Sequence, residues 1–206
     1  MATSRPAAAA RPRPVSLRRR GPVLERAILD AALEQLSTVG WSGLTMEGVA
    51  AGARTGKAAV YRRWPSKEDL VADALSAGLP RLDDARDCGG IRDDLYEVCR
   101  QLRDAMLSAP GLALRSVLHE CDVSAAERFH EVIMNGVVGP STELFREVVG
   151  RGVGRGEVRP EAVDDMVFDV IPAMMMYRTK VCGSEWPDEE IARMIDHVMM
   201  PILRSG

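Results

Sequence analysis

Apolar residues recur along this chain at the spacing of a helix. Between residues 22 and 40, for example, they follow one another at intervals of three and four, as Leu24, Ile28, Ala31 and Ala32 do. Alternating apolar and polar runs rich in β-branched residues are absent from the sequence. A period near 3.6 indicates one buried face of a helix, whereas a period of 2 indicates a strand. The pattern therefore predicts an all-α fold.

Capping residues, glycines and prolines divide this pattern into separate helices. The expected helices cover residues 22–40, 46–53, 57–64, 66–78, 91–109, 112–119, 124–150, 161–181 and 188–203. Pro140 is expected to kink the helix over 124–150. The polar segment after Pro80 is interpreted as a loop and as the best domain boundary. The glycine-rich segment 150–156 is interpreted as a flexible loop, because no strand precedes it and no phosphate-binding lysine follows it.

Residues 45–67 contain two short helical patterns joined by a tight break. Thr45 is placed to cap the first helix, and the polar residues 54–56 interrupt the apolar spacing before the second helix begins at Lys57. The apolar face of the first helix consists of Met46, Val49, Ala50 and Ala53. Two short helices joined by so sharp a turn are typical of a helix-turn-helix.

The second of these helices combines an apolar face with a cationic one. Val60 and Trp64 are four residues apart and define the buried side, which places Ala58 and Arg62 on the opposite side. Pro65 disfavours the helical conformation in the residue before it and so ends the helix. The basic residues of the exposed and flanking positions are Lys57, Arg62 and Arg63. Such side chains neutralise phosphates or donate to guanine, while alanines let a helix approach DNA closely and touch a thymine methyl group.

The stretch ARTGKAAVYRRWPSKEDL resembles the DNA-binding motif of the TetR family of bacterial transcriptional regulators, and the resemblance covers about residues 27–75. It implies a three-helix DNA-binding domain followed by a larger, variable helical domain that binds a ligand and dimerises. It also implies that Thr45 caps a helix at a phosphate, that residues 57–59 read bases, and that Tyr61 and Lys67 contact the DNA backbone. The full set of expected DNA contacts is Thr45, Met46, Arg54, Thr55, Gly56, Lys57, Ala58, Ala59, Tyr61, Arg62, Arg63 and Lys67.

Two residues of the turn depart from the family pattern. Arg54 stands where the family usually has a glycine, and Gly56 stands where it usually has a serine or a similar cap. An arginine in that turn is expected to adopt a left-handed conformation at some cost, and it adds a charge that faces DNA. Operator preference is therefore expected to differ from that of close relatives.

The net charge of −3 conceals a separation of charge between the two ends of the chain. Residues 1–68 carry twelve Lys and Arg against five Asp and Glu, a net charge of +7, and the remainder carries −10. A basic end attracts a phosphate backbone, and an acidic body is repelled by it. This distribution favours DNA binding at the N-terminal end.

We therefore divide the chain into a basic arm over residues 1–21, a DNA-binding domain over 22–78 and a larger helical domain over 79–206. The arm is rich in Pro and Arg without apolar periodicity, so we expect it to be disordered. Two interpretations of it stay open: a passive tail, or an arm that follows the phosphates or enters the minor groove.

The cysteines and histidines show no spacing typical of a metal site. Cys88, Cys99, Cys121 and Cys182 form no paired motif with one another or with the histidines, so we expect no metal, cofactor or disulfide framework. The alternative function is a redox-sensing thiol regulator or a helical enzyme that uses Cys121 with His119. These two residues point to different faces of a helix, and no third group completes a nucleophile–base set, so we expect no enzymatic activity.

The chain also lacks the patterns of membrane insertion and export. Its longest uninterrupted apolar run, residues 170–177, is far shorter than the roughly 18 residues of a membrane span. The arginine-rich start lacks the apolar core of a secretory signal. We expect a cytoplasmic protein without a membrane partner.

The expected partners are an operator in double-stranded DNA, a second copy of the chain and a small-molecule effector. One helix-turn-helix reads few base pairs, so such modules usually pair. The expected dimer interface comprises Met166, Val170, Met174, Tyr177, Ile191, Met194, Ile195 and Val198. The resemblance further implies a repressor that a small, mostly apolar ligand releases from its operator. Its expected ligand-binding residues are Met106, Phe129, Phe168, Met174, Met175 and Tyr177, together with Met176. A protein that binds DNA without sequence preference stays open as a further alternative.

Overall fold

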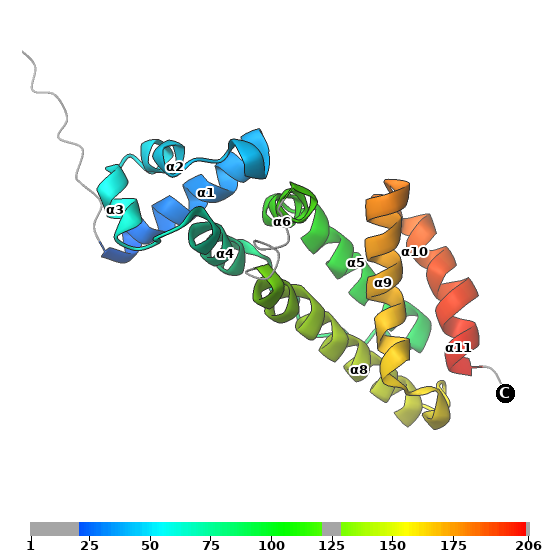
Figure 1. The fold of residues 1–206 in the computed structure, drawn as a ribbon. Helices are drawn as coiled ribbons and strands as arrows, with labels where there is room; N and C mark the ends of the chain where they lie inside the picture. The colour runs from blue at the N-terminus through cyan, green and yellow to red at the C-terminus, as the bar shows by residue number, and fades with distance from the viewer. Residues whose placement is uncertain (1–20, 121–128, 205–206) are drawn as a thin grey trace, which may run out of the picture.

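A computed structural model of the chain describes residues 21–120 and 129–204, and every regular element in them is helical (Figure 1). The N-terminal elements are α1 (Gly21–Gly43), α2 (Met46–Gly52), α3 (Lys57–Tyr61) and α4 (Lys67–Gly78). The later elements are α5 (Ile91–Leu107), α6 (Ala109–Glu120), η1 (Met134–Val138), α8 (Gly139–Gly154), η2 (Pro160–Ala162), α9 (Asp165–Cys182), α10 (Asp188–Met194), η3 (Ile195–Met199) and α11 (Met200–Arg204). The predicted all-α fold is confirmed. The predicted basic arm, apart from its last residue, and Cys121 lie outside the described residues.

Most helix boundaries follow the expected signals. Gly40, the predicted end of the first helix, interrupts α1 with a φ of 72°, a left-handed conformation that favours glycine. Gly183 ends α9 in the left-handed αL conformation, with a φ of 68°. A wide helical turn, the π-helical η1, lies just before Pro140, where the sequence predicts a kink. Such single-turn widenings let a helix change direction without losing its backbone hydrogen bonds.

The first hydrophobic core joins α1–α4 to the helices that follow them. Buried side chains of α1 to α4 pack together with Ala113, Leu114 and Val117 of α6. Phe129 belongs to the same cluster, and its ring meets that of Trp41 edge to face, with centroids 5.4 Å apart. The core therefore crosses residue 78, where the sequence places the domain boundary, and α6 packs directly on α1.

The second core lies among α5, α8, α9 and the last helices, at the other end of the molecule (Figure 1). Trp186 is fully buried in it, and its indole Nε1 donates to the carbonyl oxygen of Met175 at 3.1 Å. Ile191, Met194 and Ile195 are buried in this same core. These three residues were expected in a dimer interface, and that prediction is wrong, because their side chains face α5 and α9 of their own chain.

The glycine-rich segment is mostly helical, which corrects the predicted loop over residues 150–156. Helix α8 continues to Gly154, and only residues 155 and beyond form a turn. The absence of a side chain at Gly152 permits this packing: a Cβ there would lie 2.7 Å from Cγ2 of Val158 and 3.1 Å from Cδ1 of Ile91. Close helix contact therefore offsets the low helix propensity of glycine.

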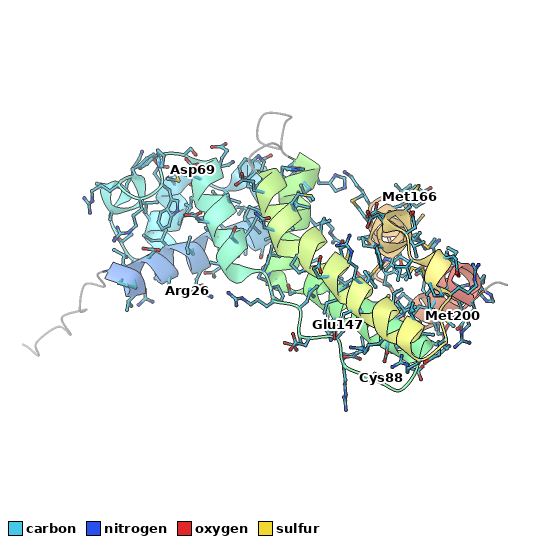
Figure 2. All side chains as sticks on the ribbon, turned by 90° about the horizontal axis from the view of Figure 1, so that it is seen from below. Arg26, Asp69, Cys88, Glu147, Met166 and Met200 are labelled. Atoms are coloured by element: carbon cyan, nitrogen blue, oxygen red, sulfur yellow. The ribbon has the colours of Figure 1, made fainter. Side chains whose placement is uncertain are left out.

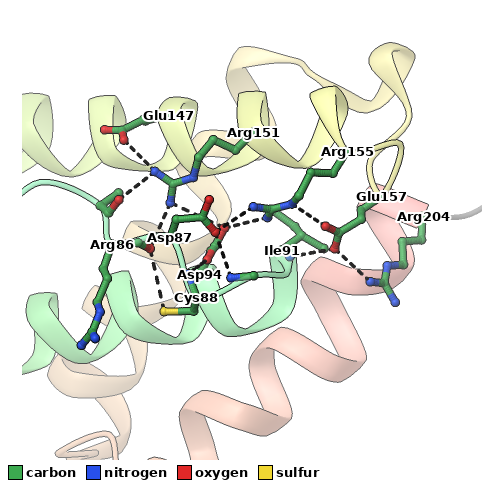
Figure 3. Close-up of polar contacts among 12 residues, drawn as sticks. Arg86, Asp87, Cys88, Ile91, Asp94, Glu147, Arg151, Arg155, Glu157 and Arg204 are labelled. Atoms are coloured by element: carbon green, nitrogen blue, oxygen red, sulfur yellow. Dashed lines mark hydrogen bonds and ion pairs between the residues drawn. The ribbon is translucent and has the colours of Figure 1, made fainter.

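Arginines of this segment hold a buried carboxylate (Figure 3). Asp94 is fully buried at the start of α5, and it accepts from Nη2 of Arg155 at 2.7 Å and from the backbone amide of Cys88 at 2.6 Å. Burial alone would raise the pKa of Asp94, but the hydrogen bonds from Arg155 and Cys88 hold this pKa below its ordinary value. Arg151 lies 3.5 Å from the same carboxylate. The network ties α8, α5 and the preceding loop together.

An apolar face of α9 stays exposed to solvent. Met166 is 78% exposed and projects from the helix (Figure 2), and Tyr177, three turns further along, is 58% exposed. Met176 and Val181 are exposed as well. No helix in the described residues is both long and apolar enough to cross a membrane.

Candidate nucleic-acid interface

The scaffold helix α2 begins at the predicted cap. Thr45 has an extended backbone, and its Oγ1 accepts from the amide of Gly48 at 3.1 Å. Gln35 of α1 fills the space beside Gly48, since a Cβ on Gly48 would lie 2.1 Å from Nε2 of Gln35. Oε1 of Gln35 also accepts from the amide of Thr45 at 3.3 Å. Contact with α1 thus explains the mid-helix glycine and fixes the start of α2.

The turn between α2 and α3 carries the predicted strain. Arg54 has a φ of 54°, which places a residue with a Cβ in the left-handed region at a cost of about 1 kcal/mol. The amide of Thr55 still donates to the carbonyl oxygen of Ala50 at 2.9 Å, so the turn remains hydrogen-bonded. Arg54 and Gly56 are exposed, and Thr55 is half-buried.

Helix α3 has the predicted division into a buried and an exposed face. Val60 and Trp64 are buried, and the indole Nε1 of Trp64 donates to Oδ2 of Asp73 on α4 at 2.7 Å. These contacts fix the rotation of α3 about its axis. The exposed residues are Lys57, Ala58 and Tyr61 of α3 and Arg62 at its C-terminal cap. Arg63 is half-buried in the turn that follows, and its Nη1 donates to the carbonyl oxygen of Ala59 at 3.1 Å. The helix predicted over residues 57–64 thus ends at Tyr61.

Met46 and Ala59, both expected to contact DNA, are each only 5% exposed and belong to the first core. Their side chains lack the exposure that a DNA contact requires, so we leave them out of the interface. Ala59 is buried beside Val60, because α3 is a short helix that packs against α2.

Lys57 is paired with Glu47, a residue that the sequence reasoning did not single out. The Nζ of Lys57 and Oε1 of Glu47 form an ion pair between α3 and α2, with both side chains more than half exposed. The hydrogen bond lowers the pKa of Glu47 and raises that of Lys57. The same Nζ lies 5.3 Å from the ring centroid of Tyr61.

Ser66 caps the start of α4, and Lys67 makes internal contacts. Oγ of Ser66 accepts from the amide of Asp69 at 3.0 Å and donates to Oδ2 of Asp69 at 2.6 Å. The Nζ of Lys67 donates to the carbonyl oxygen of Trp41 at 2.6 Å and lies 4.0 Å from the centroid of the Trp41 indole ring. Lys67 therefore joins α4 to the end of α1.

Together, these elements place Arg54, Lys57 and Arg62 on the exposed surface of α2, α3 and their turn. In Figure 1, α2 and α3 lie at the end of the molecule opposite α10 and α11. The exposed surface also includes Ala58, which has no side chain beyond Cβ. A short helix with a small residue and flanking cations suits close approach to a major groove.

The residues expected to bind a ligand are divided between the two cores. Phe129 belongs to the first core, and Met106, Phe168, Met174 and Met175 belong to the second or pack against it. Met176 and Tyr177 are exposed on α9. The structure therefore does not bring the predicted set around one cavity.

Two surface clefts lie close to these elements. One of about 610 Å³ separates the end of α3 and α4 from η1, and its lining includes Trp64, Asp73 and Asn135. The other, of about 430 Å³, is lined by Phe168 and Arg146 among others. The periodicity of the sequence does not reveal the first cleft, because it forms between segments distant in the chain.

Two of the described cysteines, Cys99 and Cys88, have raised thiol pKa values. Cys99 is buried, and burial raises the pKa of its thiol. Cys88 is exposed, but partial burial and the neighbouring carboxylates of Asp94 and Glu97 raise its thiol pKa too. A raised pKa leaves less of the reactive thiolate at neutral pH. In the described part of the chain, no three His, Cys, Asp or Glu side chains are grouped to hold a metal ion.

Two family models match most of the chain. The model for "Bacterial regulatory proteins, tetR family" matches residues 28–74, and the model for "Tetracyclin repressor-like, C-terminal domain" matches residues 85–198. The first match covers α2 and α3 and most of α1 and α4. The second covers most of the larger helical part.

Curated relatives and solved structures agree with these matches. A "DNA-binding transcriptional repressor TetR" of Mycobacteroides abscessus is 31% identical over 91% of this chain and 97% of its own. An uncharacterized HTH-type transcriptional regulator of Mycobacterium tuberculosis is 30% identical over 87% of each chain.

Among solved structures, NalD of Pseudomonas aeruginosa, the secondary repressor of a multidrug efflux pump, is 21% identical with a TM-score of 0.59 over 88% of this chain and 96% of its own. The fatty acid degradation regulator FadR of Bacillus halodurans is 17% identical with a TM-score of 0.60 over 90% of this chain and 97% of its own. The capped helix-turn-helix, the family models and the relatives agree: this chain belongs to the TetR family of bacterial transcriptional regulators and carries its DNA-binding domain.

Proposed function

We propose that this protein is a sequence-specific repressor whose α3 lies in the major groove of an operator. The observation that carries the proposal is the fixed orientation of α3: Val60 and Trp64 are locked in the core, so Ala58 and Arg62 must face outward. Fixed exposed side chains can read base edges, whereas mobile cations mainly contact phosphates. Because the proposed target is an operator in DNA, the proposal also places the protein in the cytoplasm.

Within this proposal, the exposed side chains have distinct roles. Lys57 and Arg62 donate to base acceptors, and Ala58 allows the backbone of α3 to approach the groove. Tyr61 and Arg54 contact phosphates on either side. The N-termini of α2 and α4, capped by Thr45 and Ser66, present backbone amides to the phosphates. Lys67 contributes through its place at the start of α4, because its amine is bound to Trp41.

The proposed assembly is a homodimer that uses the exposed face of α9. Met166 and Tyr177 would be covered by the same face of a second copy, which removes apolar surface from water. A dimer places two α3 helices against two half-sites of the operator. The buried residues of α10 and η3 support α9 from behind but do not join the interface.

The proposed effector is a small, mostly apolar molecule that binds among the helices of the second core. Its effect would reach the DNA-binding unit through α6. Oε2 of Glu120, at the end of α6, accepts from the amide of Ser42 at 2.9 Å, and Val117 packs in the first core. A shift of α6 would therefore displace the end of α1 and, through the same core, α4.

Reciprocal linkage tests the effector proposal. Small apolar compounds are screened for a rise in melting temperature, and each hit is titrated with and without operator DNA. We expect operator to weaken the affinity for a true effector by the factor by which that effector weakens operator binding, about 5- to 150-fold for a typical coupling. Equal affinity in the two titrations would show that the compound binds without regulating DNA.

A further inference from the structure

Glu47 places a negative charge on an otherwise cationic surface. It is the only acidic residue between Thr45 and Lys67. It lies in the first turn of α2, where a carboxylate is stabilised by the helix dipole, and its side chain is 57% exposed. Its carboxylate forms an ion pair with Lys57, the first residue of α3.

This pair restricts Lys57 in the free protein. The ammonium group pairs with the carboxylate of Glu47 and lies 5.3 Å from the ring centroid of Tyr61, and both contacts favour one position of Lys57 over α3. The pair also cancels one positive charge of the surface. Because affinity for arbitrary DNA depends on the number of free cations, the pair lowers that affinity.

On DNA, the carboxylate of Glu47 must be accommodated next to the duplex. Phosphates repel it, and guanine O6 and N7 offer it only acceptors. The base-edge donors of the major groove are cytosine N4 and adenine N6, and adenine carries the acceptor N7 beside its donor, so cytosine N4 is the better partner for a carboxylate. A sequence that offers such a donor beside Lys57 satisfies both members of the pair, and other sequences leave the carboxylate uncompensated. A repulsive group of this kind provides discrimination.

We propose that Glu47 is a specificity-determining residue, which positions Lys57 and selects half-sites that carry a cytosine at the base pair facing the Glu47–Lys57 pair. The inference rests on the proposed docking of α3 in the major groove. It assigns to the scaffold helix α2 a direct part in reading the sequence.

The test compares Glu47→Gln with wild type on three duplexes: the operator selected by the wild-type protein, the same operator with the cytosine replaced, and a random sequence. The expected result is a gain in affinity for the random duplex and a loss of about tenfold in discrimination between the first two. The matched control is Glu34→Gln, which removes the same charge from an exposed position on α1. It should change affinity for all three duplexes by one common factor.

Two outcomes separate this inference from the function on which it rests. If Arg62→Ala weakens operator binding but Glu47→Gln shifts all duplexes by a common factor, Glu47 is only a solvated charge and the inference fails. If Arg62→Ala also leaves operator affinity unchanged, α3 does not read the groove and the proposed function itself fails. Thermal unfolding checks that both variants are folded, since loss of an exposed ion pair costs little stability.

Discussion

Replacing Arg62 with alanine is expected to weaken binding to the preferred operator by about 1 to 3 kcal/mol, and replacing Lys57 should act in the same direction. Arg62 is exposed beside Ala58, on the side of α3 opposite the buried Val60 and Trp64. Removing a side chain that donates to a base lowers the affinity for the preferred operator more than the affinity for operators altered at that base. Titration of labelled duplexes with each variant measures both losses.

Two further variants serve as controls for the Arg62→Ala measurement. Arg26→Ala removes an equal charge from α1, where Arg26 pairs with Asp30 on an exposed surface, and it should leave the ranking of operators unchanged. Tyr61→Phe removes a hydroxyl expected at a phosphate, so it should weaken all duplexes alike. An Arg62→Ala loss that is equal on every duplex would place Arg62 at a phosphate and remove it from base reading.

Replacing Asp94 with asparagine is expected to lower the free energy of unfolding by about 3 kcal/mol at pH 7. The variant leaves Arg155 and Arg151 without the buried carboxylate that they share, and it weakens the acceptor for the amide of Cys88 (Figure 3). Denaturant unfolding followed by circular dichroism measures the difference. Asp93→Asn is the matched control, because Asp93 is the exposed neighbour of Asp94 and pairs only with exposed Arg92 among the contacts described.

The effect of Asp94→Asn should depend on pH. The pKa of Asp94 is lowered in the folded state, so its carboxylate contributes stability above the unfolded pKa of about 3.9 and loses that contribution as the pH falls below this value. The stability gap between wild type and variant should therefore be widest near neutral pH and narrow below about pH 4. A gap that stays constant down to pH 3 would show that the charge of Asp94 does not stabilise the fold.

Local signals explain what the sequence predicted correctly. Thr45 and Ser66 cap helices through contacts three residues away, and Val60 and Trp64 share a face because they are four residues apart. Arg54 adopts the expected left-handed conformation because only a short turn joins α2 to α3. Each of these features depends on neighbours within a few positions.

Tertiary contacts explain what the sequence did not predict. Gly152 and Gly154 have low helix propensity, but α8 continues through both, and Gly152 packs closely against Val158. Ala59 carries no mark that separates it from Ala58, and only the position of α2 determines which of the two is buried. The pairing of Lys57 with Glu47 likewise depends on how α2 and α3 cross.

The sharpest measurement is selection of duplexes from a random pool by the full-length protein, followed by competition of the recovered sequence against random DNA at fixed salt. The account predicts a shared inverted repeat, with half-sites about one helical turn or a multiple of it apart, and an affinity at least 10³-fold higher than for random DNA. Recovery of unrelated sequences that compete no better than random DNA would contradict it, and would leave a protein that binds phosphates without reading bases.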